Sequence, residues 1–225
     1  MRNLVLNVAT MSMDGYICEE NTDFWRRFGP FAMPVAPDDA EQDEMAMECI
    51  RHAGVHIMGR VTYEGWADFW PASTWPVAAI LNDIPKVVFS RTLTEARWPE
   101  SRIASGDIAE EVARLKAQDG AEIIAHGGAR FMQSLVRTGL IDEYRLAVFP
   151  VAVGSGMPLF TGAGQPYGLH LLSCHSFQSG VMLLRYRPLT ERELADRVPA
   201  ADTGLETPTG DQGDGHGADN PYLSF

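Results

Sequence analysis

A glycine pair between an apolar run and an amphipathic pattern is the feature that most constrains this fold. Residues 123–125 form the run, and Gly127 and Gly128 follow it almost at once. Apolar residues then recur at helical spacing over 131–136, and Gly139 stands where that helix would stop. A strand, a tight turn and a helix N-terminus suit phosphate, because the missing Cβ atoms let an anion approach free N–H groups. The same pattern also fits a plain strand-to-helix turn.

Composition is typical of a globular protein without membrane spans or metal sites. The chain has 225 residues, of which 45% are hydrophobic, enough for one substantial domain with a tail. No apolar run approaches the roughly 20 residues that cross a bilayer, and the N-terminus is interpreted as a strand rather than a signal peptide. The three cysteines are far apart and the six histidines lack metal-ligand spacing. We therefore expect no metal, no disulfide framework and a reducing, cytoplasmic location.

Acidic residues dominate the charge, which is −12 overall. Residues 190–225 hold eight acidic and two basic residues, and Gly, Pro and Asp are frequent there. We expect a folded domain over 1–189 and an acidic extension over 190–225, which is flexible unless residues 221–225 anchor it. The negative charge argues against nucleic acid as a partner. An anionic ligand would depend on local Arg side chains and backbone N–H groups.

The order of patterns along the chain is a strand, then repeated helix–strand units, then a strand-rich end. This order predicts an α/β fold with a mostly parallel central sheet, helices on both faces and an antiparallel C-terminal edge hairpin. Strands are expected at residues 4–9, 55–58, 86–89, 102–104, 122–125, 144–149, 169–177 and 181–186. Helices are expected from Asp38 to near Gly54, around 63–69, from Asp107 to Gly120, and from Gly128 to Gly139. Such sheets bind ligands at the carboxyl ends of their strands.

Short motifs follow four of the expected strands. They are Ser12-Met13-Asp14-Gly15, Gly59-Arg60-Val61-Thr62-Tyr63-Glu64, Val88-Phe89-Ser90-Arg91-Thr92 and His126-Gly127-Gly128, with a fifth stretch at residues 139–160. Their order resembles the dihydrofolate reductase-like superfamily and, within it, the family of the riboflavin-biosynthesis reductase domain, the RibD C-terminal domain. The resemblance covers roughly residues 2–188. It implies a dihydrofolate reductase-like fold and a site for NADPH.

The residue types at these strand ends suit that cofactor. Thr62 can donate its hydroxyl to a pyrophosphate, and Arg60 supplies positive charge. Ser90 beside Arg91 suits a ribose 2′-phosphate, which favours NADPH over NADH. The alternative for both arginines is an ordinary surface ion pair. The residues expected to contact the cofactor are Thr10, Ile17, Gly59, Arg60, Val61, Thr62, Ser90, Arg91, Gly127, Gly128, Ala129 and Arg130.

Asp14 is the candidate catalytic residue. By the resemblance it lies beside the nicotinamide, flanked by Thr10 and Ile17, where its carboxylate could orient a substrate or relay a proton. Asp14-Gly15 is also a strong turn signal, and the two roles are compatible. Folate reductases carry an acid on the helix after the first strand, and this sequence offers no recognisable equivalent. That departure argues against folate as the substrate. The sequence also lacks a basic cluster that could bind the ribose phosphate of the riboflavin-pathway substrate.

Other candidates lie around the expected site. The residues expected on the substrate side or at a dimer contact are Phe149, Pro150, Gly154 and Phe160. His126 borders the site, where a hydrogen-bonded structural role or a ligand contact would fit. An aromatic cluster, either core or interface or the lining of an apolar pocket, is expected from Trp66, Phe69, Trp70 and Trp75.

The function that these observations favour is an NADPH-dependent reductase that delivers hydride to a small heterocyclic or carbonyl/imine substrate. Its partners would be that small molecule and, as the resemblance implies, a second copy of the chain in a homodimer. One alternative is a non-catalytic sensor that binds a nucleotide or ligand on the same fold, because the catalytic acid is not placed. The other is a relative that uses a flavin or deazaflavin.

Overall fold

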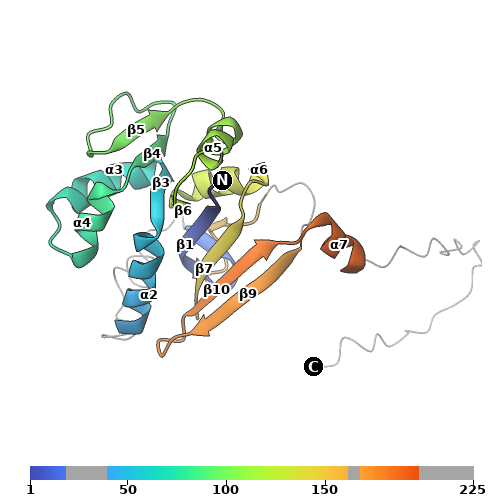
Figure 1. The fold of residues 1–225 in the computed structure, drawn as a ribbon. Coiled ribbons are helices and arrows are strands. Elements are labelled where there is room, and N and C mark those ends of the chain that lie inside the picture. The colour runs from blue at the N-terminus through green and yellow to red at the C-terminus, as the bar shows by residue number, and fades with distance from the viewer. Residues whose placement is uncertain (19–39, 162–167, 198–225) are drawn as a thin grey trace, which may run out of the picture. The chain divides into compact units, whose positions relative to one another are not determined.

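A sheet of eight strands runs through the computed structural model, which describes residues 1–18, 40–161 and 168–197 (Figure 1). Its strands are β1 (Leu4–Ser12), β3 (Ala53–Gly59), β4 (Lys86–Phe89), β5 (Ser101–Ala104), β6 (Glu122–His126), β7 (Glu143–Phe149), β9 (Leu169–Ser176) and β10 (Met182–Pro188). They neighbour one another in the order β5-β4-β3-β6-β1-β7-β10-β9. The strands from β5 to β7 are parallel, and β10 runs antiparallel to both β7 and β9. The predicted parallel sheet with an antiparallel edge hairpin is confirmed.

Helices cover both faces of this sheet, as predicted. They are α2 (Ala40–Arg51), α3 (Arg60–Phe69), α4 (Pro76–Asp83), α5 (Ile108–Lys116) and α6 (Ala129–Thr138), with a 3₁₀ turn, η1 (Trp70–Ala72), after α3. Side chains of successive strand residues point to opposite faces. Val87 of β4 accordingly joins the core that α5 and α6 cover, whereas Val88 joins the core that α3 and α4 cover. The aromatic cluster predicted after β3 is only partly in the second core, where Trp70 is buried and Trp66 packs against it. Phe69 and Trp75 contact the Trp70 ring but are about half exposed.

Local signals explain where the helices begin and end. Asp107 caps α5 by accepting hydrogen bonds from the N–H groups of Ala109 and Glu110. Gly139 ends α6 in the left-handed conformation, with a φ of 68°. Helix α5 stops at Lys116, earlier than the predicted Gly120, and α2 stops at Arg51.

Some elements differ from the sequence-based expectation. Helix α4 was not predicted, because its short apolar sequence opens with Pro76 and lacks a clear polar face. Gly54 lies inside β3 rather than at the end of the preceding helix. A two-stranded ribbon of β2 (Tyr16–Cys18) and β8 (Met157–Pro158) was also missed, because each strand is too short to show a period. The predicted helix start at Asp38 and the irregular stretch before it lie outside the described residues.

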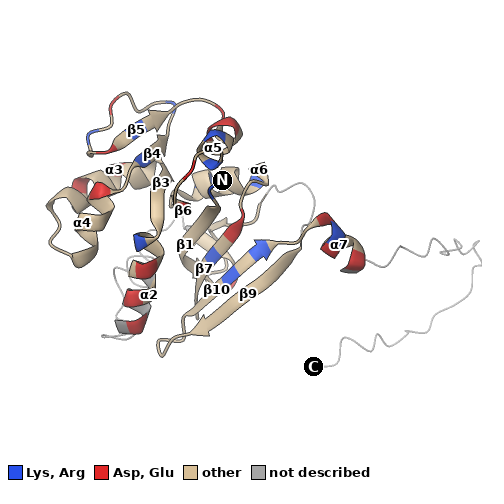
Figure 2. Ribbon diagram, in the orientation of Figure 1, with Lys and Arg blue, Asp and Glu red and all other residues tan. Residues whose placement is uncertain are grey.

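Paired charges tie β7 to its neighbours at the antiparallel edge. Glu143 accepts hydrogen bonds from Nε of Arg145 and Nε of Arg185, each at 2.7 Å. Arg145 is buried and also reaches Glu122 of β6 at 2.9 Å. Figure 2 shows these basic positions on β7 and β10 beside the acidic start of β7. The charged groups are thus paired where the sheet changes from parallel to antiparallel pairing.

The chain divides into two units, Met1–Leu189 and Thr190–Phe225. The second unit begins with α7 (Glu191–Arg197), a helix that the sequence-based expectation of an irregular tail did not include. Thr190 and Glu193 form a reciprocal capping box at its start. The predicted flexible part and its possible anchor at 221–225 lie outside the described residues. Among the helices that are described, none combines the length and apolar character needed to cross a membrane.

Candidate functional site

The predicted motifs meet at one edge of the sheet. Strands β4, β3, β6 and β1 are neighbours in that order and run parallel, so their carboxyl ends lie side by side (Figure 1). Ser90 follows β4, Gly59 ends β3, Gly127 follows β6 and Asp14 follows β1. Residues that are more than a hundred positions apart in sequence are thereby brought to a single edge, the usual ligand edge of such sheets.

Glycines let the N-termini of α3 and α6 pack against each other. Gly127 and Gly128 have positive φ angles of 38° and 80°. A Cβ on Gly127 would lie 2.5 Å from Oγ1 of Thr62, and one on Gly59 would lie 2.9 Å from Cβ of Phe131. A Cβ on Gly128 would approach the Gly59 backbone to 3.6 Å. Side chains at Gly127 and Gly59 would therefore force the turn after β6 away from the start of α3.

Both of these helix N-termini lack a side-chain cap. The N-cap positions are Gly59 for α3 and Gly128 for α6, and neither first turn carries an acidic residue. Helix α5 is different, since Asp107 caps it and Glu110 and Glu111 stand in its first turn. No described residue thus caps the first N–H groups of α3 and α6 with a side chain, which leaves them to an external acceptor, and the helix dipoles favour an anion there.

The arginines of this edge differ in their partners. Arg60 forms an i,i+4 ion pair with Glu64, with Nη1 to carboxylate oxygens at 2.7 and 3.0 Å, so the surface ion-pair alternative describes it. Arg91 and Arg130 are exposed, and their side chains have no ion pair or hydrogen bond with any described residue. The Ser90 hydroxyl accepts from the N–H of Leu93 at 2.9 Å, which leaves its own proton to donate.

The end of β1 is irregular beside this edge. The pairing of β1 with β7 shifts register between Val8 and Met11, which places Thr10 within a bulge. Thr10 and Ile17 are both half-buried, and Ile17 packs against the main core. Bulges of this kind re-aim side chains and are frequent next to active sites.

Asp14 anchors a loop. Its carboxylate accepts hydrogen bonds from the N–H of Gly154 at 2.7 Å and from the N–H of Val153 at 3.1 Å. The Ser12 hydroxyl and these backbone N–H groups hold the pKa of Asp14 below its ordinary value. Met13 adds a backbone bond to Val151. Asp14 therefore stays ionised and connects the turn after β1 to the segment after β7, which is a poor arrangement for a proton donor.

The residues predicted on the substrate side have varied surroundings. Phe149 is buried in a small apolar cluster with Phe177 and Val181. A Cβ on Gly180 would touch Pro150, and Gly154 adopts a positive φ of 73° beside Asp14. Phe160 is 42% exposed and its ring lies 5.7 Å from that of Tyr144. The Phe149 side chain thus packs inside the protein, whereas part of the Phe160 ring is accessible to a ligand or another chain.

A buried histidine pair under the glycine turn was not foreseen. The rings of His56 on β3 and His126 on β6 lie 4.5 Å apart, and the Trp66 ring is 5.1 Å from His126. Both nitrogens of His56 and Nε2 of His126 are buried and have no hydrogen-bond partner among the described residues, so the expected hydrogen-bonded role of His126 is not met there at Nε2. Burial lowers the pKa of His126 to about 4 and that of His56 well below 6.5. The alternation of side chains along β3 and β6 would predict this pair only if the two strands were already known to be neighbours in the sheet.

Comparisons with known proteins agree with this geometry. The family model described as "RibD C-terminal domain" matches residues 3–183. The chain is 28% identical over 191 residues to YyaP, an uncharacterized protein of Bacillus subtilis, covering 82% of this chain and 94% of YyaP. A solved Shewanella protein whose name assigns it to riboflavin biosynthesis superposes with a TM-score of 0.62 at 22% identity, over 84% of this chain and all of that one.

A solved dihydrofolate reductase shares the fold as well. The Enterococcus faecalis enzyme, in complex with NADP(H) and RAB-propyl, superposes with a TM-score of 0.54 at 11% identity. The match covers 84% of this chain and 97% of that enzyme. At this identity the likeness shows the dihydrofolate reductase-like fold alone. The family model spans most of the chain, and the chain therefore belongs to the RibD C-terminal domain family.

Proposed function

We propose that this protein is an NADPH-dependent reductase that delivers hydride to a small heterocyclic or carbonyl/imine substrate. The observation that carries the proposal is the pair of uncapped N-termini of α3 and α6. They pack together through Gly59, Thr62 and Gly127 at the carboxyl edge of a sheet in the RibD C-terminal domain family. In this proposal residues 1–189 form the reductase domain, and residues 190–225 form an acidic extension.

The residues at this edge fit the cofactor. The turn at Gly127 and Gly128 would bring a pyrophosphate to the free N–H groups that open α6, at Ala129 and Arg130. Thr62, already in contact with that turn, would donate its hydroxyl to the same group. When bound, the cofactor supplies the hydride.

Arg91 is the residue to which we assign the preference for NADPH. It is exposed and lacks a partner in the described part of the chain, and it stands next to a hydroxyl that can donate. A guanidinium beside a hydroxyl can bind a ribose 2′-phosphate through several charge-assisted hydrogen bonds. Arg60 is the weaker candidate, because a phosphate would have to compete with Glu64 for it.

At the nicotinamide end of the site, the protein would position the substrate rather than protonate it. Thr10 lies within the bulge of β1, where we place the nicotinamide, and Ile17 on β2 is assigned to the same ring from the family resemblance. Asp14 acts in this proposal as a positioning residue, because its carboxylate already holds the N–H groups of Val153 and Gly154. The same observation supports the second candidate, a non-catalytic nucleotide sensor, since the predicted catalytic acid is engaged and kept ionised.

The test is a fluorescence titration of the purified protein with NADPH and with NADH. We expect NADPH to bind more tightly, and Arg91→Ala to remove most of that preference, roughly tenfold or more for a charge-assisted contact. Arg97→Ala is the matched control, because Arg97 is an exposed arginine that pairs with Asp68 instead. Absence of binding by either nucleotide would exclude the reductase, and a yellow colour of the purified protein would favour a flavin. NADPH that binds but is never oxidised across a substrate panel would favour the sensor.

We also propose a homodimer. Leu171 and Leu172 on the edge strand β9, and Met182 on β10, are large apolar side chains that are 38–48% exposed. Exposed apolar residues on an unpaired sheet edge are typical of a surface that another chain covers.

A further inference from the structure

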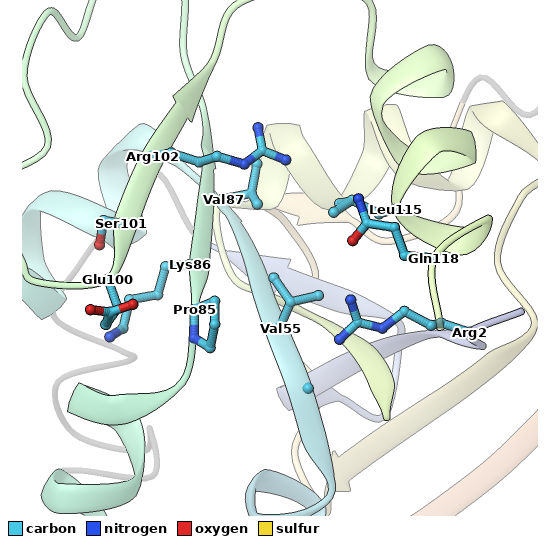
Figure 3. A pocket seen from close by; sticks show the side chains of 11 residues that line it. Arg2, Val55, Pro85, Lys86, Val87, Glu100, Ser101, Arg102, Leu115 and Gln118 are labelled. Carbon is cyan, nitrogen blue, oxygen red and sulfur yellow. The ribbon is translucent and has the colours of Figure 1, made fainter. Parts of the chain in front are cut away.

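A cavity lies at the amino ends of the strands, away from the edge that holds the candidate cofactor site. Its volume is about 460 Å³, and it lies among the starts of β3, β4 and β5 and the end of α5 (Figure 3). This is within the range of pockets that hold small organic ligands. Two buried cations, Arg2 and Lys86, lie in its lining together with apolar side chains.

The side chain of Arg2 is largely buried and has no carboxylate partner among the described residues. Arg2 is only 9% exposed. Its Nε donates to the carbonyl of Ala121 at 2.7 Å. Its two Nη atoms form no hydrogen bond with any described residue, and they are not among the atoms that are buried without a partner, so they face the open space of the cavity. The partial loss of water around the charge lowers the pKa of Arg2 from its ordinary value.

Two glycines make room for this side chain. A Cβ on Gly54 would collide with Nη2 of Arg2, and a Cβ on Gly120 would lie 3.3 Å from its Nε. Gly120 also has a φ of 139°, which other residues rarely adopt. The backbone of β3 and the turn before β6 are thus shaped around the guanidinium, which keeps it at the cavity rather than in solvent.

Aliphatic side chains of the main core close the inner end of the cavity. Val55, Val87 and Leu115 line it there, each only 2–3% exposed. Figure 3 shows Arg102 and Gln118 turned toward the same space as Arg2, from β5 and from the end of α5. Arg102 is already paired with Glu111, and Nζ of Lys86 donates to the carbonyls of Asn82 and Pro99. Of these lining cations, Arg2 is the one whose N–H groups remain open to a ligand.

We propose that this cavity binds a small organic anion, whose carboxylate or phosphate pairs with Arg2 while its apolar part packs against Val55, Val87 and Leu115. A planar guanidinium with free N–H groups can bind an oxyanion through two parallel hydrogen bonds. The exposed carboxylate of Glu100 lies on the cavity lining, and the protein carries a charge of −12. Both features favour a ligand of low charge over a polyphosphate.

The experiment is a titration of the isotope-labelled full-length chain, followed by the amide signals of Gly54 and Gly120. Benzoate and phenyl phosphate are the probes, benzamide is the neutral match for benzoate, and inorganic phosphate lacks the apolar part. We expect benzoate or phenyl phosphate to shift both glycine signals saturably. Benzamide and inorganic phosphate should each bind at least about tenfold more weakly. Comparing benzoate with phenyl phosphate shows which head group the cavity prefers.

Two variants complete the test. Arg2→Gln should abolish anion binding, whereas Arg97→Gln, which removes a surface arginine elsewhere, should not change it. If Arg2→Gln does not fold, Gln118→Glu still tests the proposal. Gln118 is exposed on the cavity lining, and the new carboxylate would pair with Arg2 and so compete with an added anion. That variant should weaken benzoate binding and raise Tm at low salt. Equal binding of benzoate and benzamide would overturn the proposal, as would signal shifts confined to Gly127 and Gly128 or unchanged binding in Gln118→Glu.

Discussion

The His56–His126 pair makes the molecule sensitive to acid at the scale of single residues. Both imidazoles are neutral in the folded protein, because burial lowers their pKa values, with smaller contributions from His126 and then Lys86 at His56. In an unfolded chain they would titrate near 6.5. Between about pH 6.5 and 4 the unfolded chain therefore binds more protons than the folded one, and the free energy of unfolding falls as the pH falls. Above pH 6.5 the pair makes no such contribution.

We expect this loss to reach about 3 kcal/mol for His126 once the pH nears 4. Urea unfolding between pH 7.5 and 4.5 measures it. His56→Leu should be nearly neutral or stabilising at pH 7.5, because it removes two buried nitrogens without partners, and it should reduce the pH dependence. His52→Leu is the control, since His52 is exposed. A pH dependence that is the same in wild type and His56→Leu would contradict the assignment.

Two glycines near the candidate site have opposite expected responses to alanine. Gly127→Ala meets Thr62 and needs a positive φ, so we expect a loss of roughly 1–3 kcal/mol in unfolding free energy together with weaker NADPH binding. Gly65→Ala sits inside α3 with nothing within 4 Å of the new Cβ, and should stabilise by about 0.5–1 kcal/mol. Thermal unfolding and the nucleotide titration compare the two. Equal effects would show that the contact with Thr62 has no consequence.

At the scale of elements, Asp14 joins the end of β1 to the segment that follows β7. We expect Asp14→Asn to weaken the hydrogen bonds to Val153 and Gly154, because the amide carries no charge. Hydrogen exchange at those two amides should accelerate, while most of the sheet stays protected. Asp119→Asn serves as the control. Asp119 is exposed, and its ion pair with the N-terminal amino group is long, at 3.9 Å. Unchanged exchange at Val153 and Gly154 would mean that Asp14 is not the anchor.

Elements with local signals could be predicted from the sequence, and elements fixed by distant contacts could not. The Asp107 cap of α5 and the end of α6 at Gly139 are each encoded within a few residues, so both could be predicted from the sequence. The placement of β6 between β3 and β1 depends on contacts between distant segments, and the histidine pair depends on it in turn. That the motifs meet at one edge of the sheet could be predicted as well, since each of them follows an expected strand; their roles in binding stay a prediction. The sequence allows Arg60 either a cofactor contact or a surface ion pair, and only the structure shows its ion pair with Glu64.

At the scale of the whole molecule, the exposed apolar side chains of the β9–β10 hairpin support the proposed homodimer. We expect the wild-type chain to sediment as a dimer at micromolar concentration and Leu172→Lys to sediment as a monomer, because a buried unpaired charge opposes association. Val61→Lys is the control, since Val61 is 70% exposed and lies on α3, far from the hairpin in sequence. A monomeric wild type, or a dimer that Leu172→Lys leaves intact, would contradict the proposed surface.

The contact between Thr62 and Gly127 also limits how these two positions can change over evolutionary time. An alanine at 127 is opposed most closely by Oγ1 and Cγ2 of Thr62, while Cβ of Thr62 lies 3.3 Å away. A lineage that first replaces Thr62 by alanine removes the nearer obstacles, and the second change then carries mainly the cost of the positive φ. The reverse order passes through the less stable intermediate. The two substitutions are therefore expected to be epistatic, with the order of their appearance decided by a single steric contact.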